Sequence, residues 1–170
     1  MAKIKAFVPA RKGSQRIPNK NVHLFKGKPL LNWTLELACK LESIDEVFLC
    51  TDIDNLSYFH RKLNVLERPT DFSDSTATII DLINYIVKRE KWKMDEIVIL
   101  LLPTAPLRVS SDVIEGLKLF NYFCGKHTII SLSKVAQPPE LLWKFHKGTL
   151  NSNFDLNNRV ASRKSNYNDY

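Results

Sequence analysis

The first 28 residues of this 170-residue chain contain no aspartate or glutamate, although they hold eight of its 25 basic residues. All 18 acidic residues follow, so the net charge of +7 belongs to one segment. A protein coated evenly with positive charge for nucleic acid does not fit this distribution, and no recognition helix or aromatic–basic sheet motif accompanies the segment. The charge predicts a local anion site or, as the simpler alternative, a basic surface patch without a ligand.

Long apolar runs and clustered cysteines are also missing. No run approaches the roughly twenty apolar residues that a helix needs to cross a bilayer, and Lys5 and Pro9 interrupt the only apolar stretch that a signal peptide could use. Cys39, Cys50 and Cys124 are far apart, and no C-x-x-C spacing occurs. We therefore expect three buried thiols in a reducing compartment, by default the cytoplasm, and no membrane partner.

Apolar periodicity predicts alternating strands and helices. Strands are expected at 4–8, 46–52, 97–102 and 127–133, and helices at 29–42, 54–63, 76–90 and 112–123. The run at 97–102 is the most apolar and indicates a central strand of a parallel sheet. This order predicts an α/β fold with a mostly parallel, Rossmann-like, three-layer sheet. The composition changes near residue 137, so we expect an α/β domain at 1–136 and a hairpin or arm at 137–170.

The loop after the first strand is the best candidate site, because ligands of open α/β sheets bind beyond the carboxyl ends of the strands. Its sequence, VPARKGSQRIPNKN at 8–21, has four cations and no carboxylate. Gly13 frees the backbone to curl, so that successive N–H groups can face an anion. Neither G-x-G-x-x-G after this strand nor G-x-x-x-x-G-K-[ST] occurs, which disfavours a dinucleotide oxidoreductase and a P-loop kinase. The loop predicts a nucleoside triphosphate site outside those classes.

The motifs of the chain resemble those of the acylneuraminate cytidylyltransferases, the CMP-sialic acid synthetase family, with its pseudaminate and legionaminate relatives. That family follows its first strand with A-R-x-x-S-x-R-x-P-x-K-N and then G-K-P-L, which this chain matches without a gap from 10 to 30. CTD at 50–52, ERP at 67–69, DSTAT at 74–78 and LLPTAPLR at 101–108 follow in the family's order. The resemblance implies a nucleotidyltransferase sheet, a nucleotide-binding domain at 1–136, and the start of a dimerisation arm at 137–170, hence a homodimer.

The resemblance also implies the reaction. CTP and a nine-carbon 2-keto sugar acid, sialic acid or a sialic-acid-like sugar, would give a CMP-sugar and pyrophosphate, with Mg²⁺ as cofactor. By position, Arg11 and Lys20 would be the catalytic cations that hold the triphosphate. Arginine suits fork-like phosphate contacts and lysine supplies a point charge, so both residue types fit this role chemically.

The remaining nucleotide-binding residues are also carried over by position. Asn21 would face the cytosine, and Ala10 would offer backbone contacts to the base. Arg68 and Thr78 would complete the cytosine pocket. The residues that would line the cleft near the ribose and the sugar are Pro103 and Thr104.

Two positions depart from the family pattern and bear on the sugar. Leu102 stands where members usually have the glutamine that contacts the acid sugar, and Ala105 stands where they usually have serine. TAPL is closer to relatives that handle bacterial sialic-acid-like sugars such as pseudaminate. The related 3-deoxy-manno-octulosonate enzymes carry Q-G-D-E-P here, and this chain lacks that metal-binding aspartate, so this substrate ranks lower. Arg108 either touches the sugar acid or anchors its loop, and the sugar used stays open.

The family's later R-P-N-G segment and paired metal-binding aspartates have no counterpart before Tyr170. We therefore expect the chain to lack the C-terminal part of the family, and its metal ligands are unknown. Asp52 and Asp54 favour a turn or capping role over a metal-binding one. Two hypotheses remain: the nucleotide-binding part of a cytidylyltransferase that is active when complete, or a non-catalytic nucleotide-binding or dimerisation module.

Overall fold

The computed structural model describes residues 2–14, 17–72, 78–133, 143–146 and 149–152, the last two ranges by their backbone alone. The chain divides into two compact units, Met1–His127 and Thr128–Tyr170. This division lies before the boundary that the composition predicts at 136–137. Among the described residues, no helix is long and apolar enough to span a membrane.

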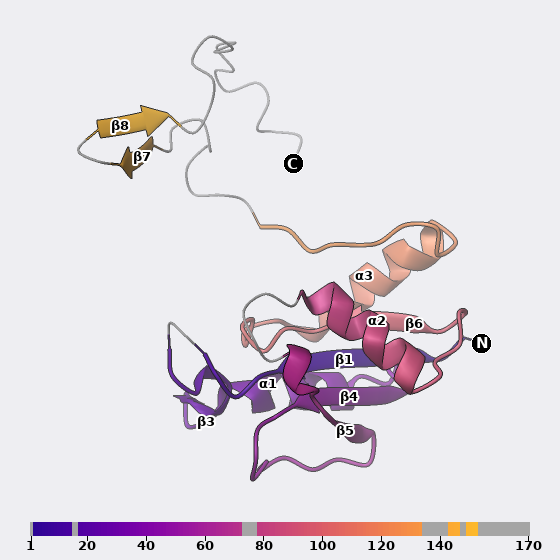
Figure 1. The fold of residues 1–170 in the computed structure, drawn as a ribbon. Coiled ribbons are helices and arrows are strands. Elements are labelled where there is room, and N and C mark those ends of the chain that lie inside the picture. Colours follow the sequence, from indigo (N-terminus) through magenta and orange to yellow (C-terminus); the bar gives the residue numbers. More distant parts are fainter. Residues whose placement is uncertain (1, 15–16, 73–77, 134–142, 147–148, 153–170) are drawn as a thin grey trace. The chain divides into compact units, whose positions relative to one another are not determined.

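The first unit is built on a parallel sheet, as the sequence predicts (Figure 1). Its strands are β1 (Ile4–Ala10), β4 (Glu46–Thr51), β5 (Leu63–Glu67) and β6 (Ile97–Leu100), in the order β5-β4-β1-β6. Every neighbouring pair is parallel, so the carboxyl ends of all four strands meet at one edge. Within the described sheet β1 lies in the interior and β6 pairs only with β1, so the expected central position of 97–102 is wrong there.

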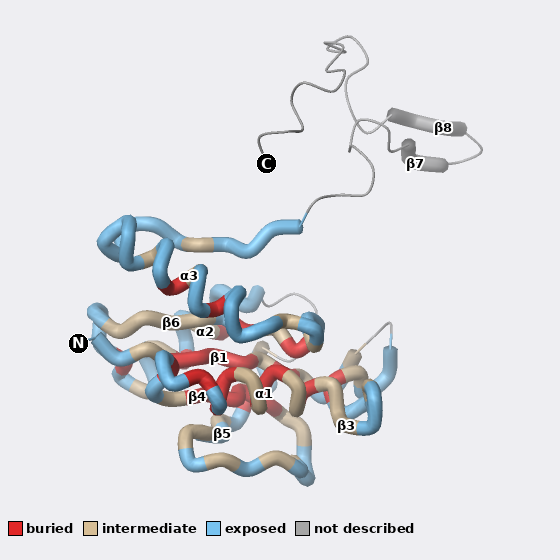
Figure 2. The backbone as a smooth tube through the Cα atoms, turned by 180° about the vertical axis from the view of Figure 1, so that it is seen from behind, coloured by how far each residue is buried: buried red, intermediate tan, exposed pale blue. Residues whose placement is uncertain are grey.

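Helices cover both faces of this sheet. They are α1 (Leu30–Lys40), α2 (Ile79–Arg89) and α3 (Ser110–Tyr122). Successive side chains of a strand point to opposite faces, so Val8 joins the buried cluster of α1 and α3, whereas Phe7 joins the cluster of α2 and Trp92. Figure 1 shows α2 in front of the sheet, and Figure 2, from behind, shows α1 and α3 on the nearer face. The three-layer α/β prediction is confirmed.

Short elements connect β1 to α1. The one-turn helix η1 (Lys20–Val22) leads into a small antiparallel hairpin of β2 (Leu24–Phe25) and β3 (Lys28–Pro29). The hairpin turn needs Gly27, whose φ of 83° is in the left-handed region that glycine adopts without steric cost. Trp33 of α1 fixes the hairpin, because its Nε1 donates to the carbonyl of Phe25 at 3.0 Å. The G-K-P-L motif therefore forms the turn that starts α1.

Three expectations fail. Residues 54–63 form no helix, because Asp54 and Asn55 make a bend in which Asn55 has a φ of 54°. The chain then enters β5, a strand that the sequence analysis did not predict. Residues 127–133 form no strand, and Leu132 is 89% exposed. Cys124 is exposed in the turn after α3, whereas Cys39 and Cys50 are buried as expected.

The second unit contains one described hairpin, β7 (Trp143–His146) paired antiparallel with β8 (Thr149–Ser152). It agrees with the hairpin predicted at 137–170. The dimerisation role of this segment stays a prediction, and most of its residues lie outside the described ranges.

Candidate functional site

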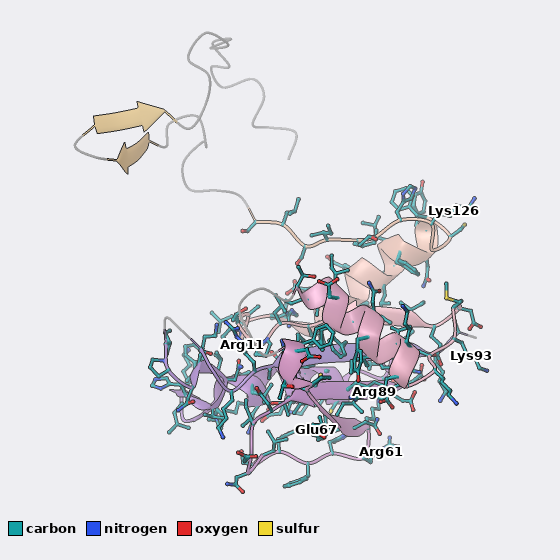
Figure 3. All side chains as sticks on the ribbon, viewed as in Figure 1. Arg11, Arg61, Glu67, Arg89, Lys93 and Lys126 are labelled. Atoms are coloured by element: carbon teal, nitrogen blue, oxygen red, sulfur yellow. The ribbon has the colours of Figure 1, made fainter. Side chains whose placement is uncertain are left out.

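The basic loop begins at the carboxyl end of β1, where the neighbouring strand fixes its first residue. Ala10 and Thr51 are register partners, and the Thr51 hydroxyl donates to the carbonyl of Ala10 at 2.6 Å. The same hydroxyl accepts from the N–H of Ile53 at 3.1 Å, so the loops that follow β1 and β4 leave the sheet as a linked pair. Figure 3 shows Arg11 at this end of β1. Ala10 is 1% exposed; its predicted contact with a base stays a prediction.

Asn21 closes the basic loop. Asn21 is only 6% exposed, and its Nδ2 donates to the carbonyl of Arg11 at 2.9 Å. Asn19 turns the chain into η1 with a left-handed φ of 52°, and the N–H of Lys20 bonds to Ile17 at 3.2 Å. The two ends of the loop are thus held together by a buried amide. The structure gives Asn21 a bracing role that sequence reasoning missed, and its predicted contact with cytosine is untested.

Two carboxylates from the loop after β4 hold Lys12. Asp52 Oδ1 accepts from the backbone N–H of Lys12 at 2.5 Å, and Asp54 Oδ2 pairs with Lys12 Nζ at 2.8 Å. The hydrogen bond and charge of Asp54 raise the pKa of Lys12, and those of Lys12 lower the pKa of Asp54. A pocket of about 240 Å³ lies beside this pair; its lining residues are Lys12, Asn19, Val22, Ile53, Asp54 and Asn55. These contacts join the loop after β4 to the basic loop, and the turn or capping role expected for the two aspartates stays a prediction.

Arg68 follows β5 and reaches the same edge. It is 9% exposed; its backbone N–H donates to Thr51, and its Nε and Nη2 donate to the carbonyl of Phe72 at 3.1 and 2.5 Å. Burial is the main cause that lowers the pKa of Arg68; the positive charge of Arg11 lowers it further, and Asp52 opposes both. Arg11, Arg68 and Asp52 are therefore electrostatic neighbours. The guanidinium of Arg68 also holds the turn η2 (Thr70–Phe72).

Thr78 begins α2 and caps it. Its hydroxyl accepts from the N–H of Asp81 at 3.1 Å, and its own backbone N–H donates to Asp81 Oδ2 at 3.4 Å, which is a capping box. The hydroxyl also donates to Asp81 Oδ2 at 2.6 Å. The sequence analysis assigned this threonine to the cytosine pocket and missed the cap, although the T-x-x-D spacing indicates it. Residues 73–77, which join Thr78 to the rest of the site, lie outside the described ranges.

The loop after β6 brings Pro103 and Thr104 to the same edge. The N–H of Leu101 donates to the carbonyl of Phe7 at 2.9 Å, which continues the β6–β1 pairing toward the carboxyl end. Pro103 is buried and Thr104 is exposed. The loop closes on itself, since Arg108 Nη2 donates to the carbonyl of Leu102 at 3.4 Å. The loops that follow β1, β4, β5 and β6 thus share one edge.

The described residues do not fit a complete Mg²⁺ site. None of them form a group of three or more histidine, cysteine, aspartate or glutamate side chains that could hold a metal ion. The two carboxylates nearest the basic loop, Asp52 and Asp54, already accept from Lys12.

Comparisons with known proteins agree with this architecture. Residues 6–114, from β1 to the first half of α3, match the sequence model of the family described as cytidylyltransferase. The chain belongs to the cytidylyltransferase family. The resemblance seen in its motifs is confirmed, because its similar proteins include N-acylneuraminate and pseudaminic acid cytidylyltransferases.

The individual similarities differ in extent. The chain is 28% identical to the N-acylneuraminate cytidylyltransferase of Escherichia coli O18:K1:H7 over 96% of its own length and 39% of that protein. It is 33% identical to the pseudaminic acid cytidylyltransferase of Campylobacter jejuni over 64% of its own length and 48% of that protein. The solved structure of CMP:2-keto-3-deoxy-manno-octonic acid synthetase complexed with CTP has a TM-score of 0.56 at 24% identity, over 71% of this chain and 48% of that one. This likeness confirms the nucleotidyltransferase fold. The chain spans about half or less of the length of each protein.

Proposed function

We propose that this cytidylyltransferase-family chain binds CTP at the carboxyl edge of its sheet, as the nucleotide-binding part of an enzyme that activates a nine-carbon 2-keto sugar acid. One observation carries the proposal. The cation-rich loop after β1 is fixed at both ends, by Asn21 on the carbonyl of Arg11 and by Asp52 on the N–H of Lys12. A cationic loop whose two ends are fixed loses less entropy when an anion binds than a loop with free ends, which favours a triphosphate over a loose counterion layer.

The reaction follows from the charge that the loop must handle. The anomeric hydroxyl of the sugar acid loses its proton to solvent as its oxygen attacks the α-phosphorus of CTP, the bond from that phosphorus to the bridging oxygen of pyrophosphate breaks, and pyrophosphate leaves with the electron pair. Arg11 and Lys20 would neutralise the negative charge that grows on the leaving group. The loss of one such cation would cost about 3 kcal/mol of transition-state stabilisation, roughly a hundredfold in rate.

We propose that Mg²⁺ accompanies CTP, held by phosphate oxygens and water, as is usual for this ion with nucleotides. The reaction would take place in the cytoplasm, a reducing compartment that suits the thiols of Cys39 and Cys50. The segment 137–170 would contribute to a homodimer.

For the sugar, we propose the nine-carbon class. The names of the similar curated proteins, which include N-acylneuraminate, diacetyllegionaminic acid and pseudaminic acid enzymes, support it. A 3-deoxy-manno-octulosonate cytidylyltransferase of Bdellovibrio bacteriovorus is 36% identical over 51% of this chain, which keeps the eight-carbon acid as the alternative. Both classes share a carboxylate next to the anomeric carbon.

Calorimetric titration of Arg11→Ala and Lys20→Ala with CTP tests the proposed loop. We expect each variant to lose at least tenfold in CTP affinity, while thermal unfolding stays near that of the parent chain. Arg61→Ala is the matched control, because Arg61 is an exposed cation on the segment before β5 (Figure 3). Equal affinity in parent, Arg11→Ala and Lys20→Ala would refute the assignment. Pyrophosphate release by the chain with CTP and N-acetylneuraminate would exclude the non-catalytic module, whereas binding without turnover is expected from both hypotheses.

A further inference from the structure

Lys12 is a cation of the basic loop that the protein itself already binds. Its Nζ pairs with Asp54 Oδ2 at 2.8 Å, and its backbone N–H donates to Asp52 Oδ1 at 2.5 Å. Both carboxylates come from the loop after β4, which the register of β1 with β4 brings beside the basic loop. A lysine that faces a carboxylate has less charge to offer to an incoming anion, because the two opposite charges partly cancel. Asp54 therefore opposes the binding of an anion by this part of the loop.

The pair between Lys12 and Asp54 is open to solvent. The Lys12 side chain is 60% exposed and that of Asp54 is 74% exposed. Ion pairs in such surroundings are weak, since water screens the charges and both side chains lose rotamer freedom. The pair of Lys5 with Glu96, at the amino end of β1, is different: its side chains are 7% and 10% exposed, and Lys5 Nζ also lies 4.7 Å from the ring centre of Trp92. Lys12 can thus leave its carboxylate at a small cost, whereas Lys5 cannot.

The pocket of about 240 Å³ gives an anion access to this pair. Both members of the pair line it, together with residues from each of the two loops. Its volume is below the roughly 300–1,000 Å³ of pockets that enclose a drug-sized ligand, so it suits one charged group better than a whole nucleoside. Asn19 and Asn55 add amide groups, which can donate to phosphate oxygens. A phosphate group that enters the pocket would meet Lys12 and Asp54 together.

A triphosphate and Asp54 then compete for one ammonium group. The triphosphate carries several negative charges and Asp54 carries one, so the attraction to Lys12 favours the triphosphate. The gain is reduced because the ion pair must break first. It is reduced again because the carboxylate left behind repels the phosphate at short distance.

We propose that Asp54 makes an autoinhibitory contact: it holds the ammonium of Lys12, which an incoming triphosphate must take from it before the basic loop binds at full strength. The inference rests on the proposed function, which supplies the triphosphate, and goes beyond it by naming the residue that opposes binding. Asp52 holds the backbone of Lys12 throughout, so the exchange needs only the side chain to change its partner.

Calorimetric titration of the full chain with inorganic tripolyphosphate tests this, at low ionic strength where charges are least screened. Asp54→Asn removes the charge and keeps the size of the side chain, so the affinity should rise roughly two- to fivefold. Asp54→Glu keeps the carboxylate and should stay near the parent chain. Asp71→Asn is the matched control, because Asp71 is an exposed carboxylate of η2 at the same edge. Its effect measures the general loss of negative charge and should be smaller than that of Asp54→Asn.

A double-mutant cycle with Lys12 separates the exchange from simple removal of charge. In Lys12→Gln the ion pair is gone, so the further change Asp54→Asn should raise the affinity no more than Asp71→Asn raises that of the parent chain. Thermal unfolding checks that each variant is folded. Parent-like affinity in Asp54→Asn overturns the proposal, and so does an equal gain from Asp54→Asn with and without Lys12.

The outcomes also distinguish this inference from the proposed function. If tripolyphosphate binding depends on Lys12 and Asp54 as predicted but CTP binds no better than ATP, the autoinhibitory contact stands and the proposed function fails. If CTP binds selectively and with equal affinity to the parent chain and to Asp54→Asn, the proposed function stands and the contact is overturned. Failure of tripolyphosphate to bind either protein overturns the contact as well.

Discussion

The buried amide of Asn21 should decide how well the basic loop binds a triphosphate. In Asn21→Ala the carbonyl of Arg11 loses the hydrogen bond that Nδ2 donates at 2.9 Å in a site only 6% exposed. A buried acceptor left without its donor costs about 1–3 kcal/mol. We therefore expect the free energy of unfolding to fall by about 1–2 kcal/mol, and the loop to lose the brace between its ends.

The looser loop must be ordered again when an anion binds. If about 1–2 kcal/mol of that ordering falls on the binding step, the dissociation constant for the triphosphate rises roughly five- to thirtyfold. Urea unfolding, followed by tryptophan fluorescence, measures the stability, and calorimetry measures the binding of both CTP and inorganic tripolyphosphate. Asn64→Ala is the matched control, because Asn64 is exposed on β5 and donates only to its neighbour Lys62 at 3.3 Å.

The two ligands distinguish a brace from a contact with the base. A brace weakens CTP and tripolyphosphate to the same extent, whereas a direct contact with cytosine weakens CTP alone. If Asn21→Ala binds tripolyphosphate as tightly as the parent chain, the bracing role is refuted. If Asn21→Ala is as stable as the parent chain, the hydrogen bond from Asn21 to the Arg11 carbonyl contributes nothing to stability.

Three further predictions concern groups around the site. Lys12 lowers the pKa of Asp54, so their ion pair stabilises the fold above the ordinary carboxylate pKa, and this stabilisation is lost as the pH falls through the lowered pKa. Asp54→Asn should remove this contribution to the fall in unfolding free energy at acid pH, as measured by urea titrations. An unchanged pH profile would contradict the prediction. Thr78→Ala should lower the free energy of unfolding by about 1 kcal/mol through loss of the α2 cap; Thr78→Ser, which keeps the hydroxyl, should restore it, and a neutral alanine variant would argue against the cap. Burial raises the pKa of Cys50 to about 11, so in the native protein Ellman's reagent at pH 8 should modify Cys124 and spare the buried thiols; fast labelling of all three would contradict the packing.

The sequence predicts those parts of the fold that depend on local pattern. The apolar period of α1 and the uninterrupted apolar run of β6 both carry enough residues to identify the element. The segment 54–63 misleads because its partly buried Leu56 and Tyr58 pack on the core without a helix, after a bend at Asn55. Burial by tertiary contact and burial on a helix face leave the same apolar residues in the sequence. In β5 the apolar residues are interrupted by Asn64 and Val65 is 52% exposed, so no clear alternation marks it.

For the site, residue type and motif order identify the edge but not the contacts. The cations of the basic loop are visible in the sequence, and their resemblance to a known motif predicts a ligand for them. The partners that hold the loop are not visible, since Asp52 reaches Lys12 only through the register that aligns β1 with β4. The ion pair of Lys12 with Asp54 is equally hidden, because only the folded loops bring the two side chains together.

The most direct test of the central claim is a calorimetric titration of this chain with CTP and then with ATP, each with and without Mg²⁺. The account predicts saturable binding of CTP at least tenfold tighter than that of ATP, because a phosphate-binding loop alone does not distinguish the two and the cytosine pocket must. Equal binding of both nucleotides would contradict the cytosine site, and binding of neither would contradict the assignment of the basic loop to a triphosphate.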